Sequence, residues 1–94
     1  MPAHPVTIET ICADILASGV RLGDYQRELL RGERRWSGGD LRGRAAKWGL
    51  GYRRSRDRVA ELILAEAARQ GVVVEWVGGT STTGPVRPMV VGRR

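Results

Sequence analysis

The chain has 94 residues, with 16 Lys+Arg against 10 Asp+Glu and a formal net charge of +6. This length supports one modest hydrophobic core, so we expect a single domain over residues 1–94. The lone cysteine and histidine, Cys12 and His4, exclude an internal disulfide and a zinc cluster, so we expect no metal and no cofactor. No apolar run approaches the roughly 18 residues that span a bilayer, and no export signal is present. We therefore expect a cytoplasmic protein that does not contact membranes.

The positive charge is concentrated in the middle of the chain. Residues 1–20 carry a net charge of -2, residues 21–58 a net charge of +7 and residues 59–94 a net charge of +1. Fifteen of the 16 cations are arginine, whose planar guanidinium suits bidentate contact with phosphate or guanine. A basic block of this kind indicates an anionic partner, with nucleic acid and acidic protein as the main classes.

Apolar spacing predicts two helices in the first third of the chain. Thr7 precedes apolar residues at helical spacing, which predicts a helix over about residues 7–18 that ends at Gly19. Asp24 is placed to cap a second, shorter helix over about residues 24–31, which ends at Gly32.

Two further helices are predicted within and after the basic block. Ser37 and Asp40 resemble a capping box, and the apolar residues that follow predict a helix over about residues 38–48. A short turn at residues 49–52 then leads to the longest predicted helix, over about residues 53–70, which ends at Gly71.

The residue pattern changes after Gly71. Residues 72–77 are β-branched and aromatic, residues 78–85 are typical of a loop, and residues 86–91 read as a returning strand. Pro88 cannot donate a ladder hydrogen bond, so its strand should have an open edge. The predicted fold class is α+β and mainly helical, with three to four helices followed by a C-terminal β-hairpin over about residues 72–91.

The residues between the last two predicted helices carry a family resemblance. Ala45, Gly49, Leu50 and Gly51 match the alanine, turn glycine, apolar and small positions of the helix-turn-helix motif, and a hairpin follows the second helix. The chain therefore resembles the winged helix-turn-helix family, although Ser55 and Arg58 stand where that family has apolar residues. The resemblance implies that the helix after the turn enters the DNA major groove and that the hairpin loop contacts the adjacent backbone.

Four arginines, at 53, 54, 56 and 58, fall at the predicted start of the helix over 53–70. The positive end of the helix dipole disfavours cations there, so the cluster favours an anionic ligand. The open alternative is a solvated face on which Arg58 pairs with Asp57 or Glu61. Further residues are expected to contact the DNA backbone directly or from the hairpin loop. The full set of candidate nucleic-acid-binding residues is Arg42, Arg44, Lys47, Tyr52, Arg53, Arg54, Ser55, Arg56, Arg58, Thr82 and Arg87.

The tryptophans are expected to divide between core and surface. Trp48 and Trp76 have the spacing of core residues. Trp36 and Tyr52 could instead pack at a helix start or contact sugar-phosphate.

The scattered carboxylates show no catalytic spacing, so we do not expect an enzyme and assign no catalytic residue. The sequence predicts a small basic protein that binds double-stranded DNA, a transcriptional regulator or accessory DNA-binding factor of bacterial or phage type. It would act at the nucleoid, or in the host cytoplasm if phage-encoded.

Two alternatives remain open: a phage-type inhibitor or adaptor that binds a protein of a nucleic-acid-processing machine, and an RNA-bound ribonucleoprotein component. A homodimer is also open.

Overall fold

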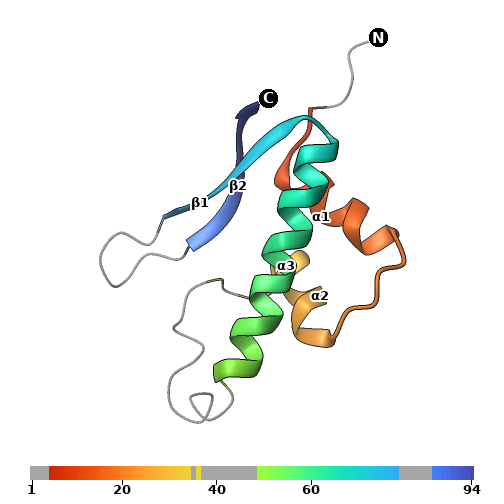
Figure 1. Ribbon diagram of the computed structural model, residues 1–94, viewed down its shortest axis with the longest axis vertical. Helices are drawn as coiled ribbons and strands as arrows, with labels where there is room; N and C mark the ends of the chain where they lie inside the picture. Colours follow the sequence, from red (N-terminus) through yellow and green to blue (C-terminus); the bar gives the residue numbers. More distant parts are fainter. Residues whose placement is uncertain (1–4, 35, 37–48, 79–85) are drawn as a thin grey trace.

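The helices and the hairpin follow one another along the chain in the computed structural model, which describes residues 5–34, 36, 49–78 and 86–94, with the backbone alone at 49–53, 78 and 86. The described elements are α1 (Ile8–Ala17), α2 (Asp24–Leu30), α3 (Gly49–Arg69), β1 (Val72–Gly78) and β2 (Val86–Arg93). Helix α3 forms the centre, with α1 and α2 on one side and the hairpin on the other (Figure 1). The described part is thus α+β, with three helices before an antiparallel hairpin. The predicted helix over 38–48 lies outside the described residues.

Helix α1 starts where the sequence predicts. Thr7 is its N-cap, and the Thr10 backbone N–H donates to Thr7 Oγ1 at 3.2 Å. The Thr7 backbone N–H donates in turn to Thr10 Oγ1 at 3.0 Å, so each side chain satisfies one unpaired amide.

The predicted cap of α2 is wrong by one residue. Gly23, not Asp24, is the N-cap, and its N–H donates to Gln26 Oε1 at 2.9 Å. Asp24 is the first residue inside the helix, where its carboxylate is stabilised by the positive end of the helix dipole. Glycine is tolerated as an N-cap, and here the Gln26 side chain satisfies the cap amide.

Glycines in the left-handed conformation follow all three helices. Gly19, Gly32 and Gly71 have φ values of 82°, 77° and 75°, which confirms the three predicted helix ends. Gly71 also joins α3 to β1, and its carbonyl accepts from the Arg94 N–H at 2.9 Å.

The predicted turn at residues 49–52 is wrong, because these residues form the start of α3. The helix runs unbroken from Gly49 to Arg69, four residues longer at its start than the predicted 53–70. Glycine costs at most about 1 kcal/mol inside a helix. Each residue added to an existing helix gains a backbone hydrogen bond, so two glycines near the end do not break it.

The hairpin has one irregularity in its register. Val73 is opposite Gly92 and Val74 is opposite Val90, so Val91 is an extra residue that forms a β-bulge. Trp76 is opposite Pro88, and β2 pairs only with β1 among the described strands. The predicted loop residues 79–85 lie outside the described residues.

The core takes its buried residues from α1, α2, α3 and β1 and from the segments before and after α2. Its buried apolar residues are Ile11, Cys12, Ile15, Leu22, Leu29, Leu30, Trp36, Val59, Ile63, Ala67, Val72 and Val74. Trp36 packs edge-to-face on Trp76, with ring centroids 5.4 Å apart. Trp36 is therefore a core residue, whereas the sequence left open a contact with sugar-phosphate. Trp76 packs against the core as predicted, and Trp48 lies outside the described residues.

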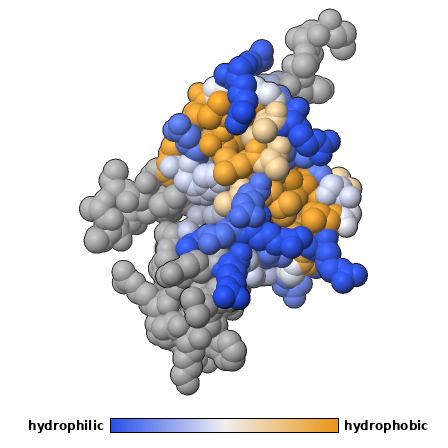
Figure 2. Space-filling model, in the orientation of Figure 1, coloured by the Kyte–Doolittle hydropathy of each residue, from blue (hydrophilic) through white to orange (hydrophobic). Residues whose placement is uncertain are grey.

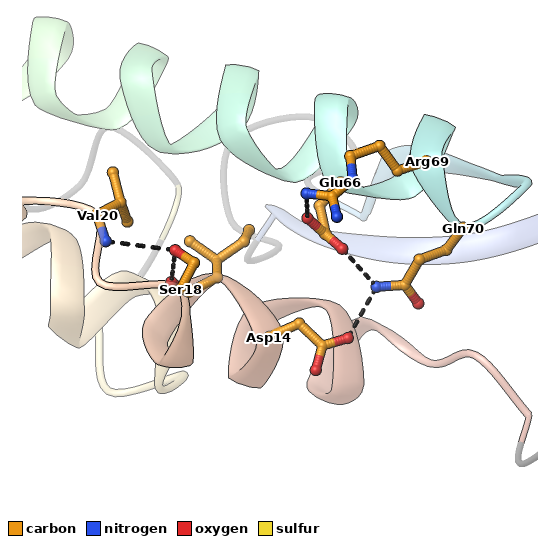
Figure 3. Close-up of polar contacts among 7 residues, drawn as sticks. Asp14, Ser18, Val20, Glu66, Arg69 and Gln70 are labelled. Atoms are coloured by element: carbon orange, nitrogen blue, oxygen red, sulfur yellow. Dashed lines mark hydrogen bonds and ion pairs between the residues drawn. The ribbon is translucent and has the colours of Figure 1, made fainter.

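A polar contact joins the end of α3 to α1 across this core. Gln70 Nε2 donates to Asp14 Oδ2 and to Glu66 Oε2, each at 2.8 Å, and Arg69 contacts Glu66 at 3.1 Å (Figure 3). Ser18 Oγ donates to the Ile15 carbonyl at 2.6 Å and accepts from the Val20 N–H, which fixes the turn after α1 (Figure 3). These contacts hold the C-terminal end of α3, so that its opposite end extends away from the hairpin (Figure 1).

Candidate nucleic-acid interface

Helix α3 presents two faces of different character. Val59, Ile63 and Ala67 recur every four residues and are 0%, 0% and 2% exposed, so this face is buried in the core. Arg54 and Arg58, also four residues apart, are exposed on the side turned away from Val59. One helical turn, about 6 Å, separates them along the helix axis, so their guanidinium groups are neighbours on one surface.

The described arginines divide into paired and unpaired groups. Four of them have an acidic partner: Arg27 with Asp24 at 3.5 Å, Arg31 with Glu33 at 3.8 Å, Arg34 with Glu28 at 2.8 Å, and Arg69 with Glu66 at 3.1 Å. Arg54 and Arg58 form no ion pair with any described residue, although Asp57 and Glu61 are nearby and exposed. The alternative of local pairing between Arg58 and Asp57 or Glu61 is therefore not what the structure shows.

Arg56 points toward the body of the protein. It is half-buried, and its Nη1 donates to the Trp36 carbonyl oxygen at 3.3 Å. The hydrogen bond joins α3 to the backbone of the buried Trp36, so the guanidinium is engaged within the chain. Nothing in the local sequence distinguishes Arg56 from Arg54, because the partner is 20 residues away.

The adjacent Ser55 is also held by a contact from another helix. Gln26 Nε2 donates to the Ser55 backbone carbonyl at 3.3 Å, and the Ser55 side chain is half-buried. Together with the Arg56 contact, this bond fixes the direction in which the N-terminal half of α3 leaves the core. The sequence did not predict that Gln26 contacts α3, because no pattern of neighbouring residues indicates a contact across 29 positions.

The remaining candidate residues fall in three places. Arg87 is exposed on β2, opposite Val77, and lines hollows beside α1 and α2. Tyr52 and Arg53 belong to α3, where the backbone alone is described. Arg42, Arg44, Lys47 and Thr82 lie outside the described residues.

The start of α3 at Gly49 changes the electrostatic reasoning. Arg54, Arg56 and Arg58 are the sixth, eighth and tenth residues of the helix and so lie beyond its first turn. The effect of the helix dipole falls off within that turn, so the expected repulsion does not act on them. What favours an anionic ligand is instead that Arg54 and Arg58 are exposed and form no ion pair within the described part of the chain.

Most of the net charge is adjacent to this part of α3 in the sequence. Residue 35 and residues 37–53 carry five arginine or lysine residues against one aspartate, which is +4 of the total +6. On the described surface, Figure 2 shows a band of strongly hydrophilic residues across the lower part, with further hydrophilic residues at the top and right edges and apolar residues between them. Between residues 54 and 61 of α3, where side chains are described, the exposed charged residues are Arg54, Asp57, Arg58 and Glu61.

Other kinds of site find no support among the described side chains. The described side chains include no group of three His, Cys, Asp or Glu residues that could hold a metal ion. No helix in the described ranges has the length and hydropathy needed to cross a membrane. Burial, aided by the charge of Glu9, raises the pKa of the Cys12 thiol to about 11, so the thiol stays protonated at neutral pH.

Comparison of the chain with protein-family models, with curated proteins and with solved structures yields no match.

Proposed function

We propose that this protein binds double-stranded DNA through the exposed face of the N-terminal half of α3, with the hairpin as a wing. Residues 49–52, which include the residues matched to the turn of the helix-turn-helix motif, are helical, so the proposal does not rest on that turn. The observation that carries the proposal is the division of the arginines. Arg27 in α2 and Arg69 at the end of α3 have acidic partners, whereas Arg54 and Arg58 are exposed and form no ion pair with any described residue. The same holds for Arg21, Arg87, Arg93 and Arg94, but only Arg54 and Arg58 are one helical turn apart on a helix. Two neighbouring guanidinium groups without partners are suited to phosphate oxygens or to guanine.

The shape of the helix supports groove binding. An α-helix with its side chains is about 10–12 Å across, and the B-DNA major groove is about 12 Å wide. The N-terminal half of α3 extends past the hairpin, so this end could enter a groove (Figure 1). Asp57 and Glu61 are exposed on either side of Arg58 and would repel phosphates, which places the proposed contact toward the Arg54 end.

Additional phosphate contacts would come from the basic residues that precede α3. Arg42, Arg44, Lys47 and Arg53 are close to Arg54 in sequence and would add to the positive charge at this end. The loop over residues 79–85 would contact the adjacent backbone as the wing. Such a protein would serve as a transcriptional regulator or an accessory DNA-binding factor.

The proposal is tested by the salt dependence of binding to a labelled duplex. Each phosphate contact contributes about 0.9 to the slope of log K against log salt. Replacing both arginines, R54Q with R58Q, should lower the magnitude of that slope by about 1.8. When the salt concentration rises fourfold, the fold-loss of affinity should therefore be roughly ten times smaller for the double variant than for the wild type. Fluorescence anisotropy at 50 and 200 mM salt measures both slopes.

A matched control separates a specific surface from net charge. The double variant R27Q with R69Q removes the same two positive charges from arginines that have acidic partners. We expect its slope to stay close to the wild-type value. No binding at 50 mM salt, or equal losses in the two double variants, would refute the proposal. Structured RNA that outcompetes duplex DNA would also refute it, because the deep, narrow major groove of A-form RNA excludes side chains.

A further inference from the structure

Two hollows that share four lining residues form one groove, and no α3 side chain that the structure describes lines it. Their volumes are about 370 and 410 Å³, and both are lined by Ile8, Glu9, Arg87 and Pro88. We call this surface the α1–β2 groove; its other lining residues are Val6, Thr7, Cys12, Leu29, Leu30, Arg31, Gly32, Arg34, Trp36, Met89 and Val90. The combined volume lies in the range of ligand-binding clefts, about 300–1,000 Å³.

The groove follows the outer edge of β2. Four consecutive strand residues, 87–90, line it, and successive strand side chains point to opposite faces. The groove therefore runs along the strand edge rather than over one face of the hairpin. That edge has no described strand beside it, and the opposite wall is the chain over residues 6–9 as it enters α1.

The floor of the groove is apolar. Cys12, Leu29, Leu30 and Trp36 are 2–8% exposed, and Pro88 is also buried. These residues belong to the core, so the floor is held rigidly in place. An apolar side chain seated there would be shielded from water at no cost in reorganising the protein.

The rim of the groove carries charged residues of both signs, and two of its arginines already have acidic partners. Three arginines, Arg31, Arg34 and Arg87, line it with one carboxylate, Glu9. Arg34 is held by Glu28, and Arg31 is 3.8 Å from Glu33 with both side chains more than half exposed. Arg87 forms no ion pair with any described residue. Arg87 therefore gives the groove its strongest attraction for a carboxylate.

We propose that the α1–β2 groove binds an extended, acidic segment of a partner protein. Apolar side chains of the segment would contact the floor, and its carboxylates would pair with Arg87 and Arg31 at the rim. Pro88 lacks an N–H, so the segment cannot form a continuous ladder with β2. Side-chain contacts must then supply the specificity. An extended chain fits because its alternate side chains can face the floor and the rim.

A labelled peptide tests the proposal directly. The probe is a blocked, fluorescein-labelled peptide of alternating leucine and glutamate, and its control carries glutamine in place of glutamate. Anisotropy measures binding to the full chain, and tryptophan fluorescence gives a second readout because Trp36 forms part of the floor. We expect the glutamate peptide to bind at least tenfold more tightly than the glutamine peptide.

Three variants locate the binding to the groove. Arg87→Gln should weaken binding about tenfold, and Glu9→Gln should tighten it a few-fold because a like charge is removed. Arg93→Gln is the matched control, since Arg93 is exposed on the same strand but does not line the groove. It should leave the affinity unchanged. Thermal melting of each variant confirms that the fold is retained.

The outcomes that would overturn the proposal are distinct from failure of DNA binding. Equal affinity for the two peptides, or no effect of Arg87→Gln, would show that the rim does not select carboxylates. Displacement of the bound peptide by unlabelled duplex DNA would show that the groove is part of a nucleic-acid surface. A concentration-dependent dimer that excludes the peptide would assign the groove to a second copy of the chain. None of the described α3 side chains, from Arg54 onward, lines the groove, so loss of DNA binding leaves this test intact.

Discussion

Replacement of Arg56 by methionine separates a structural role from DNA contact. Methionine keeps an unbranched apolar stem but removes the guanidinium that donates to the Trp36 carbonyl at 3.3 Å. A hydrogen bond from a charged group contributes about 1.5–3 kcal/mol, and a long bond at a half-buried site falls below that range, at about 1 kcal/mol. For a domain of this size, 1 kcal/mol corresponds to a fall in Tm of about 4–8 °C.

Thermal unfolding followed by circular dichroism measures this change. Near-ultraviolet dichroism should change as well, because the Trp36 carbonyl is next to the edge-to-face pair that Trp36 forms with Trp76. Arg58→Met is the control, since Arg58 is exposed and unpaired among the described residues, and its Tm should change by less than about 3 °C. If Arg56→Met melts with the wild type but loses DNA affinity, Arg56 contacts the ligand and the structural assignment is refuted.

Three further predictions concern stability, each measured by urea denaturation. Ile63→Ala should lower the free energy of unfolding by about 2–5 kcal/mol with no change in m-value, because Ile63 is 0% exposed; a loss under 1 kcal/mol would contradict its core position. Gly71→Ala should lower the free energy of unfolding by about 1–2 kcal/mol, because φ at Gly71 is 75°. Gly92→Ala is the control: its φ is ordinary and the space around it is open, so the loss should stay below about 0.5 kcal/mol, as for other surface changes. Equal losses would refute the assignment to backbone strain. The raised pKa of Cys12 means that the thiol holds its proton more tightly in the folded state than in the unfolded state. Its contribution to stability is therefore fully present below pH 9, and the free energy of unfolding falls by up to about 2–3 kcal/mol as the pH rises to about 11. Cys12→Ala should remove that decline, and an unchanged decline would show that another group causes it.

The first helix and the helix ends could be predicted because their determinants are local. Thr7 precedes an apolar stripe, and Gly19 and Gly71 follow such stripes, so capping and periodicity within a few residues suffice. The same local reasoning failed at residues 49–52, where glycine content suggested a turn. Glycine permits a turn but does not require one, and the extended helix is favoured by its own hydrogen bonds.

The candidate site could be predicted in part. The sequence pointed to the arginines at 53–58 as a group, but it could not separate Arg56 from Arg54 and Arg58. That separation depends on the Trp36 carbonyl, which tertiary packing places beside α3. The α1–β2 groove was not predicted at all, since β2 is far along the sequence from the α1 and α2 residues that form its other walls.

The sequence by itself determined a central basic block of +7 over residues 21–58 and an order of helices followed by a hairpin. Charge and periodicity are properties of neighbouring residues, so they can be read without knowing the fold. Only the tertiary structure decided which arginines have partners. An ion pair or hydrogen bond requires two groups within a few ångströms, and for Arg56 that proximity arises when the core around Trp36 brings distant segments together.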